Sequence, residues 1–149
     1  MKVYRISAIT LKVKDMEKSC SLYSKIPGFT LTYGGAPFDS FTTFKIGEGS
    51  KATYLNLERT KNHEGSSADS YKKPKLRKTK GNEDFGRIIF HTENVDKLYL
   101  YMKNDEYISK SIEFENGPTN APWGERFFHI REPNGYQLSF AQPLSSMDQ

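Results

Sequence analysis

The chain has 149 residues, a formal net charge of +4 and a pI of about 9.0, and its length fits one domain with a single core. A basic balance this mild does not by itself indicate nucleic acid, and no run reaches the ~20 apolar residues that a membrane span requires. The single cysteine, Cys20, excludes an internal disulfide, and the N-terminal residues lack the continuous apolar core of a signal peptide. We therefore expect a cytoplasmic protein.

The first 58 residues predict a strand, a helix and three further strands. The opening strand and helix each present one apolar face, formed by Ile9, Leu11 and Val13 in the strand and by Met16, Cys20, Tyr23 and Ile26 in the helix. Asp15 stands between the two elements as the expected N-cap of the helix, and Pro27-Gly28 ends it. Strand-like runs then cover residues 29–33, 41–46 and 52–57.

The same order of elements returns after residue 85. The second strand and helix present their own apolar faces, formed by Ile88, Phe90 and Thr92, and by Val95, Leu98, Tyr99 and Met102. Asn94 is the expected N-cap, and strand-like runs follow at residues 109–114, 125–130 and 136–141. Asn134-Gly135 predicts a hairpin turn between the last two runs.

The two halves align with each other. Residues 9–18 match residues 88–97 without a gap, and residues 55–57 lie over residues 138–140. A repeat of this length indicates the duplication of one supersecondary unit.

Residues 59–85 interrupt the repeat with a stretch rich in Ser, Gly, Asn and Lys, which predicts a long basic loop between the two units. A lysine run is usually a solvated surface, and Tyr71 is the only aromatic residue interleaved with the charges, so nucleic acid is not favoured as a partner. A lid that orders over a bound ligand is the better functional interpretation of this loop.

Two sets of motifs resemble one known superfamily. Residues 9–19, continuing to Leu22-Tyr23 and Pro27-Gly28-Phe29, are similar to the opening of a module of the glyoxalase / bleomycin-resistance / dioxygenase (vicinal oxygen chelate) superfamily. The closing motif resembles the version in bleomycin-resistance proteins and comprises Pro122-Trp123-Gly124, Arg126-Phe127-Phe128, Arg131-Glu132-Pro133-Asn134-Gly135 and Leu138-Ser139-Phe140.

The resemblance implies an α+β fold of two βαβββ modules, about residues 1–58 and 86–144, within a single domain across residues 1–149. The modules would form a curved mixed sheet around a cup, with the helices on the outer face. The resemblance also implies a homodimer. It does not decide the function, because the superfamily includes isomerases, ring-cleaving dioxygenases, thiol transferases and drug-binding proteins.

In members of the superfamily that use a metal, the ligand positions correspond to Ala8, Asn56, Arg87 and Ser139 of this sequence. Ala8 has no donor atom, Arg87 is a permanent cation, and the other two offer only neutral oxygens. We therefore expect no metal and no other cofactor. A divalent ion would require a shifted set such as Glu58 and His91, and two ligands make a poor site.

The residues that we expect to bind a ligand, either in the cup or in a groove between two subunits, are Arg87, Tyr54, Asn56, Glu58, His91, Trp123 and Ser139. Arg87 is expected to hold a carboxylate or phosphate through two parallel hydrogen bonds, while Tyr54 and Trp123 supply apolar contact. The alternatives are an Arg87–Glu58 ion pair that closes the cup and a Trp123 that plugs the edge of the core. No catalytic residue is assigned.

The residues therefore favour a metal-independent protein that binds a polar or anionic small molecule, for example an antibiotic. The related bleomycin-resistance proteins hold a cationic drug in an acidic groove, and the basic charge of this chain departs from that pattern. The alternatives are a lyase, isomerase or dioxygenase of the superfamily with an atypical site, or a protein-interaction module that uses the basic loop.

Overall fold

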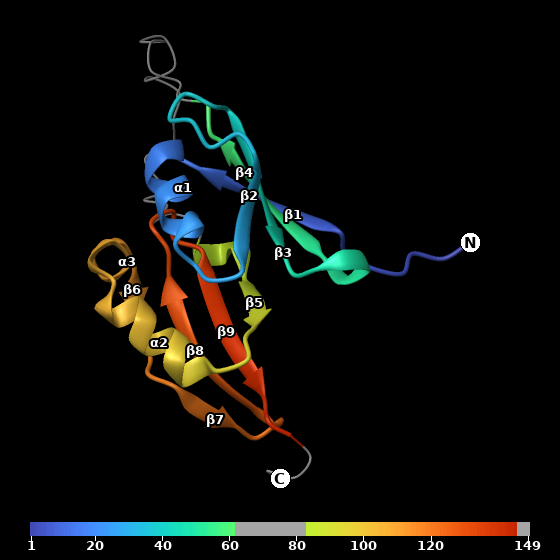
Figure 1. The fold of residues 1–149 in the computed structure, drawn as a ribbon, viewed down its shortest axis with the longest axis vertical. Coiled ribbons are helices and arrows are strands. Elements are labelled where there is room, and N and C mark those ends of the chain that lie inside the picture. The colour runs from blue at the N-terminus through green and yellow to red at the C-terminus, as the bar shows by residue number, and fades with distance from the viewer. Residues whose placement is uncertain (62–82, 146–149) are drawn as a thin grey trace. The chain divides into compact units, whose positions relative to one another are not determined.

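The computed structural model describes residues 1–61 and 83–145, and the strands of these residues form two separate sheets. The chain divides into two units after Lys78. We refer to the described parts of the two units as module 1 (residues 1–61) and module 2 (residues 83–145). Apart from its two ends, the predicted basic loop 59–85 lies outside the described residues. The predicted α+β fold with two βαβββ modules is confirmed (Figure 1).

Module 1 contains β1 (Ala8–Val13), α1 (Met16–Ser24), β2 (Phe29–Tyr33), β3 (Phe41–Ile46), a 3-10 turn (Gly49–Lys51) and β4 (Thr53–Arg59). The strand order is β1-β4-β3-β2, in which β1 runs parallel to β4 and the other pairs are antiparallel. Leu11, Leu55 and Leu57 are fully buried on the face that α1 covers, where Tyr23 of α1 packs between Phe29 and Phe44. We call the opposite side of each sheet its open face.

The start of α1 follows the sequence prediction. The carboxylate of Asp15 accepts a hydrogen bond from the backbone N–H of Lys18 at 3.0 Å, which satisfies one of the free amides of the first turn. Further along α1, Cys20 is buried and its Sγ lies 3.5 Å from Thr42 Oγ1. Burial raises the pKa of the Cys20 thiol, so this group stays protonated and packs as a small apolar side chain.

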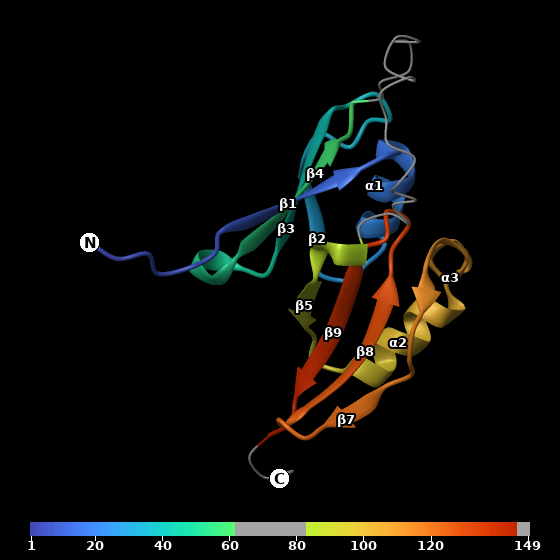
Figure 2. The same cartoon turned by 180° about the vertical axis from the view of Figure 1, so that it is seen from behind.

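Module 2 contains a 3-10 turn (Glu83–Phe85), β5 (Arg87–His91), α2 (Val95–Asn104), α3 (Glu106–Ser111), β6 (Glu113–Phe114), β7 (Thr119–Ala121), β8 (Glu125–Arg131) and β9 (Gln137–Pro143). The strand order is β5-β9-β8-β6, and β7 also pairs with β8. The strands β5, β9 and β8 lie side by side in Figure 2. No helix in residues 1–61 and 83–145 is long and apolar enough to cross a membrane.

The pairing of the strands supports the internal repeat. Thr10 of β1 lies beside Asn56 of β4, and the corresponding residues of module 2, Ile89 and Ser139, lie beside each other in β5 and β9. Both pairs join parallel strands, as expected for two copies of one unit.

The core of module 2 is aromatic. Phe128 of β8 is fully buried, with its ring centre 5.2 Å from that of Tyr99 on α2 and 5.3 Å from that of Phe140 on β9. Phe114 completes the group through an edge-to-face contact with Tyr99 at 5.4 Å. Such contacts stabilise a core beyond the apolar area that they bury, so this cluster holds α2 against the sheet.

The prediction of a strand over residues 109–114 is wrong for most of its length. Residues Glu106–Ser111 form α3, and only Glu113–Phe114 are a strand. Asp105 caps α3 by accepting from the N–H of Ile108 at 2.9 Å, and Ile108 is fully buried. A good cap and one buried apolar residue thus outweigh the weak alternation of polar and apolar residues in this stretch. The short strand β7 was not predicted.

The turn between β8 and β9 is built around a buried carboxylate. The side chain of Glu132 accepts hydrogen bonds from the backbone N–H groups of Asn134 and Tyr136 and from Asn134 Nδ2. Gly135 has a φ of 90°, a conformation that favours glycine and that agrees with the predicted Asn134-Gly135 turn. This turn sets the positions of Arg131 and Gln137 at its two ends.

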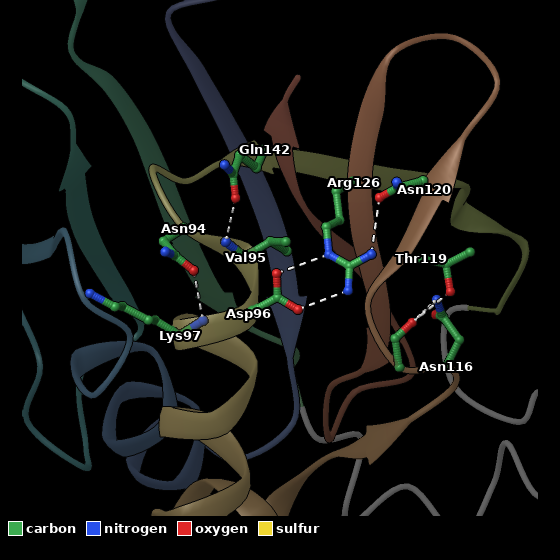
Figure 3. A network of polar contacts seen from close by, with 10 residues as sticks. Asn94, Val95, Asp96, Lys97, Asn116, Thr119, Asn120, Arg126 and Gln142 are labelled. Atoms are coloured by element: carbon green, nitrogen blue, oxygen red, sulfur yellow. Dashed lines mark hydrogen bonds and ion pairs between the residues drawn. The ribbon is translucent and has the colours of Figure 1, made fainter. Parts of the chain in front are cut away.

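The start of α2 is tied to the sheet by polar side chains (Figure 3). The predicted N-cap Asn94 accepts from the N–H of Lys97 at 2.9 Å, and Gln142 of β9 accepts from the N–H of Val95 at 3.0 Å. The guanidinium of Arg126 on β8 donates two hydrogen bonds of 2.9 Å to the carboxylate of Asp96. The first turn of α2 is therefore fixed to both β8 and β9.

Replacing Asp96 with asparagine is expected to lower the free energy of unfolding by about 0.5 kcal/mol at pH 7, because solvent screens this partly exposed ion pair. Hydrogen bonding from Arg126 lowers the pKa of Asp96. The stabilisation is therefore complete above the pKa of an unfolded aspartate and is lost as the pH falls through the lower folded value. Urea unfolding of both proteins at pH 7 and about pH 3 tests this. A difference that does not shrink at the lower pH would contradict it.

Candidate functional site

The open face of module 2 gathers polar and aromatic side chains from three adjacent strands. On β8, Phe128 and Ile130 point toward the core, so the residues that alternate with them point to the open face. The strand pairing places these side chains in three rows across β5, β9 and β8, namely Arg87, Gln137 and Arg131; Ile89, Ser139 and His129; and His91, Ala141 and Phe127.

An aromatic row, which is distinct from the three rows across the sheet, runs along β8 and the turn before it. Trp123, in the turn between β7 and β8, stacks on Phe127 with a ring separation of 5.9 Å and an interplanar angle of 20°. Phe127 in turn contacts the ring of His129 at 4.7 Å. Trp123 is 68% exposed, so it is not a plug at the edge of the core. We call Trp123, Phe127 and His129 the aromatic row.

A chain of hydrogen bonds and one ion pair crosses the end of the face nearest the β8–β9 turn. Arg87 Nε donates to Gln137 Oε1 at 2.8 Å, and Gln137 Nε2 donates to Glu115 Oε1 at 3.0 Å. The same carboxylate oxygen pairs with Arg131 Nε at 3.1 Å. The two guanidinium groups and the one carboxylate of these linked side chains together carry one net positive charge. We call Arg87, Gln137, Glu115 and Arg131 the polar chain.

Arg87 is the cation of the polar chain that is available to a ligand. Its Nε is oriented by Gln137, while its two terminal nitrogens have no partner within residues 83–145. Arg131, by contrast, is bound to Glu115 and donates from Nη1 to the carbonyl oxygen of Gly135 at 3.1 Å. A pre-oriented guanidinium with a free pair of donors matches the geometry of a carboxylate or phosphate.

His129 is the member of the aromatic row nearest the polar chain. Its backbone N–H donates to Asn116 Oδ1 at 2.7 Å, whereas its ring Nδ1 is buried and has no hydrogen-bond partner among the described residues. Burial lowers the pKa of His129, and the positive charge of Arg87 lowers it further, against the opposing effect of Glu115. The imidazole is therefore neutral near pH 7.

Two further predicted residues of module 2, His91 and Ser139, differ in how accessible they are to a ligand. His91 lies at the other end of the face, with Nε2 3.5 Å from Glu125 Oε1. Ser139 is only 3% exposed and forms the floor of the middle row, beneath Ile89 and His129 on the neighbouring strands. Contact of a ligand with Ser139 therefore requires its neighbours to move aside.

The predicted residues of module 1 share the open face of that module. Tyr54 is 38% exposed, and Glu58 forms an ion pair with Lys12 of β1. The amide of Asn56 is held by its neighbours, since its Oδ1 accepts from Thr43 Oγ1 at 2.9 Å and its Nδ2 donates to Thr10 Oγ1 at 3.2 Å. The structure thus brings together one set of predicted residues in each module.

An Arg87–Glu58 ion pair would join the two modules and stays a prediction. Four further residues of the site, on β8 and in the segment after β6, were not predicted from the sequence, namely Phe127, His129, Arg131 and Glu115. The alternation of β8 about the apolar residues Phe128 and Ile130 was the signal that pointed to the first three.

The side chains at the metal-ligand positions of related proteins do not fit a divalent ion. In module 1, Ala8 has no donor, and the Asn56 amide is already hydrogen bonded on both sides. In module 2, Arg87 carries a positive charge and Ser139 is nearly fully buried. No group of three or more His, Cys, Asp or Glu side chains suited to a metal occurs in the part of the chain that the structure describes.

Module 1 also has a hollow of about 710 Å³ beside the start of α1. Lys14, Arg59, Asp15 and Glu58 are among its lining residues, so its charges are mixed. Both acids already have partners, because Asp15 caps α1 and Glu58 pairs with Lys12. The open face of module 2 therefore offers the clearer binding chemistry.

Comparison with known proteins points to one superfamily. A sequence model of the Glyoxalase/Bleomycin resistance protein/Dioxygenase superfamily matches residues 5–140. No curated protein sequence matches the chain. A glyoxalase/bleomycin resistance protein/dioxygenase from Nocardioides has 20% sequence identity and a TM-score of 0.61, over 98% of this chain and 87% of its own.

Two further solved structures share the fold. TioX from Micromonospora sp. ML1 has 15% identity and a TM-score of 0.62, over 95% of this chain and 100% of its own. A glyoxalase/bleomycin resistance protein/dioxygenase family enzyme from Burkholderia phytofirmans PsJN has 12% identity and a TM-score of 0.61, over 93% of this chain and 98% of its own. At these identities the similarity establishes the fold alone.

Proposed function

Because the chain belongs to the glyoxalase/bleomycin resistance protein/dioxygenase superfamily, we propose that it is a metal-independent binding protein for a small anionic molecule. The open face of module 2 is the binding surface in this proposal. The observation that carries it is the guanidinium of Arg87, oriented by Gln137 with its terminal nitrogens free, on the same face as an exposed tryptophan.

The polar chain selects the charge of the ligand. Its one net positive charge favours an anion, and the free nitrogens of Arg87 favour one with two oxygens, such as a carboxylate or a phosphate. A cationic drug would meet the same positive charge and be disfavoured. An antibiotic would therefore fit this face if it carries an acidic group.

The aromatic row selects the body of the ligand. Trp123 and Ile89, which is 57% exposed, offer apolar surface to either side of Phe127 and His129. Exposed apolar groups of this size, with polar residues at one end, are typical of a binding site. A flat apolar group attached to the anion would cover this surface by stacking.

The direct test is a calorimetric titration with 2-naphthoate, compared with its neutral counterpart 2-naphthamide. We expect saturable binding of the anion that is at least about tenfold tighter than that of the amide, since the amide lacks the charge-assisted hydrogen bonds to Arg87. The chain has one tryptophan, so a single indole N–H signal in a ¹H–¹⁵N spectrum reports binding at Trp123. Equal affinity for both compounds, or an unshifted indole signal, would argue against the proposal.

Metal content is expected to be below about a tenth of an equivalent per chain, because the donor set does not suit Zn, Ni, Mn or Fe. Elemental mass spectrometry on untagged protein, purified without chelator and then offered each metal, measures it. The titration with 2-naphthoate should be unchanged by EDTA. One tightly held ion per chain would instead mean that a metal binds at other residues. Lyase and dioxygenase assays would then be the first priority.

The proposal includes a cytoplasmic homodimer. Val3, Tyr4 and Ile6 are largely exposed ahead of β1, and neighbouring apolar side chains of this size are commonly covered by another protein surface. The single buried cysteine is compatible with a reducing compartment.

A further inference from the structure

We infer that His129 contacts the bound anion directly and that the anion binds together with a proton. This inference rests on the proposed function and adds to it a specificity-determining residue. It also adds the requirement that the ligand offer one acceptor to Arg87 and a second to the imidazole.

His129 is in the middle row of the open face, and its neighbours along β8 are Phe127 of the aromatic row and Arg131 of the polar chain. The middle row separates Trp123 and Phe127 from the polar chain, and its other members are Ile89 and Ser139. Ile89 has no polar side-chain atom and Ser139 is only 3% exposed, so His129 is the member of this row that can donate a hydrogen bond to a ligand extending between the two groups.

The imidazole of His129 lacks a hydrogen-bond partner in module 2. Its Nδ1 is buried without a hydrogen bond, and its Nε2 has no partner within residues 83–145. Buried polar groups normally find partners, because an unpaired one loses its hydration without compensation. A ligand oxygen beside the ring would supply the partner that the described residues do not.

Three charged side chains act on the ring. Arg87 on β5 and Arg131 on β8 are positive, and Glu115 in the segment after β6 is negative. On β9, the register places the neutral Ser139 beside His129, with Gln137 and Ala141 two residues to either side. The free site therefore disfavours a third positive charge, whereas a bound anion would reverse the balance and favour the imidazolium.

The linkage between binding and protonation has a definite sign. Burial and Arg87 lower the pKa of His129 in the free protein, and a bound anion raises it. Affinity for the anion therefore increases as the pH falls through the pKa of the complex, and it levels off below the pKa of the free protein. Between about pH 8 and pH 6 we expect affinity to increase roughly three- to tenfold.

The experiment is a calorimetric titration of the full chain with 2-naphthoate at several pH values and in two buffers of different ionisation enthalpy, which counts the protons taken up. His129→Gln retains a polar side chain that does not titrate. His63→Gln is the matched control, since it removes a histidine that is not among the residues of the proposed site. Near-ultraviolet circular dichroism verifies that both variants keep their tertiary packing.

We expect the wild type and His63→Gln to take up a substantial fraction of a proton, and His129→Gln to bind 2-naphthoate with no uptake and a flat pH profile. In the wild type, the ring signals of His129 should titrate at a higher pH once 2-naphthoate is bound. Proton uptake that persists in His129→Gln would overturn the inference while leaving the proposed function intact. Absence of binding in every variant at every pH would overturn both.

The same titration with phenyl phosphate distinguishes the two kinds of oxyanion. A phosphate monoester has its own ionisation near neutral pH, so its proton balance in His129→Gln measures the contribution of the ligand alone. We expect the His129-dependent part to be the same for both probes. If neither probe shows proton uptake that is lost in His129→Gln, the inference is overturned.

Discussion

Replacing Arg87 with alanine is expected to weaken the binding of 2-naphthoate by about 10- to 100-fold. A hydrogen bond to a charged group contributes about 1.5–3 kcal/mol, and each 1.4 kcal/mol corresponds to a tenfold change in affinity. Arg87 is the cation of the polar chain whose terminal nitrogens are free within residues 83–145, so no neighbour in module 2 can replace it without breaking the Arg131–Glu115 pair. Calorimetric titration at pH 7 measures the change.

Two controls make this result specific. Arg87→Lys keeps the charge but loses the two parallel donors, so its affinity should fall between those of the wild type and the alanine variant. Arg126→Ala removes the same charge from module 2 at a residue already bound to Asp96 and Asn120, and it should leave affinity within about twofold of the wild type. Arg87→Ala and Arg126→Ala with indistinguishable affinities would rule out Arg87 as the anion anchor.

Replacing Phe128 with alanine is expected to lower the free energy of unfolding by about 3–5 kcal/mol, the largest effect on stability that we predict. The ring is 0% exposed and contacts Tyr99 at 5.2 Å and Phe140 at 5.3 Å. Its removal leaves a cavity between α2 and the sheet that neighbouring rings cannot fill without leaving their own contacts. Urea unfolding at pH 7, followed by far-ultraviolet circular dichroism, measures the loss.

The adjacent residue of β8 is the matched control. Phe127 has the same side chain but lies on the open face, stacked between Trp123 and His129. Phe127→Ala should lower the free energy of unfolding by only about 1 kcal/mol, the value of one aromatic contact, and should weaken the binding of 2-naphthoate. A loss of stability as large as that of Phe128→Ala would contradict the assignment of Phe127 to the open face and of Phe128 to the core.

Local sequence signals were sufficient to predict most of the elements. Asp15 and Asn94 each precede an apolar helical stripe, and both cap their helices as expected. The alternation of β1 likewise separates the buried Leu11 and Val13 from the exposed residues between them. These features depend on spacings of two to four residues, and such spacings can be read from one sequence.

The parts of the site that escaped prediction depend on contacts between distant residues. Glu115 follows a strand of only two residues, and it reaches Gln137 and Arg131 because the pairing of β6 with β8 continues to it through the hydrogen bond from its N–H to the carbonyl oxygen of His129. The burial of Ser139 likewise follows from the size of its neighbours across the sheet. Register identifies which residues are adjacent, whereas side-chain packing decides which of them a ligand can reach.

The position of β5 at the edge of its sheet affects the tendency of the protein to aggregate at high concentration. β5 is the outermost strand beside β9, and its sequence Arg87-Ile88-Ile89-Phe90-His91 has no charge within its apolar centre. Natural proteins usually protect such strands with lysine or proline, as β1 is protected by Lys12. The protein would therefore be prone to strand-to-strand aggregation through β5, and introducing a lysine at Ile89 would improve its solubility at the expense of the ligand's apolar contact.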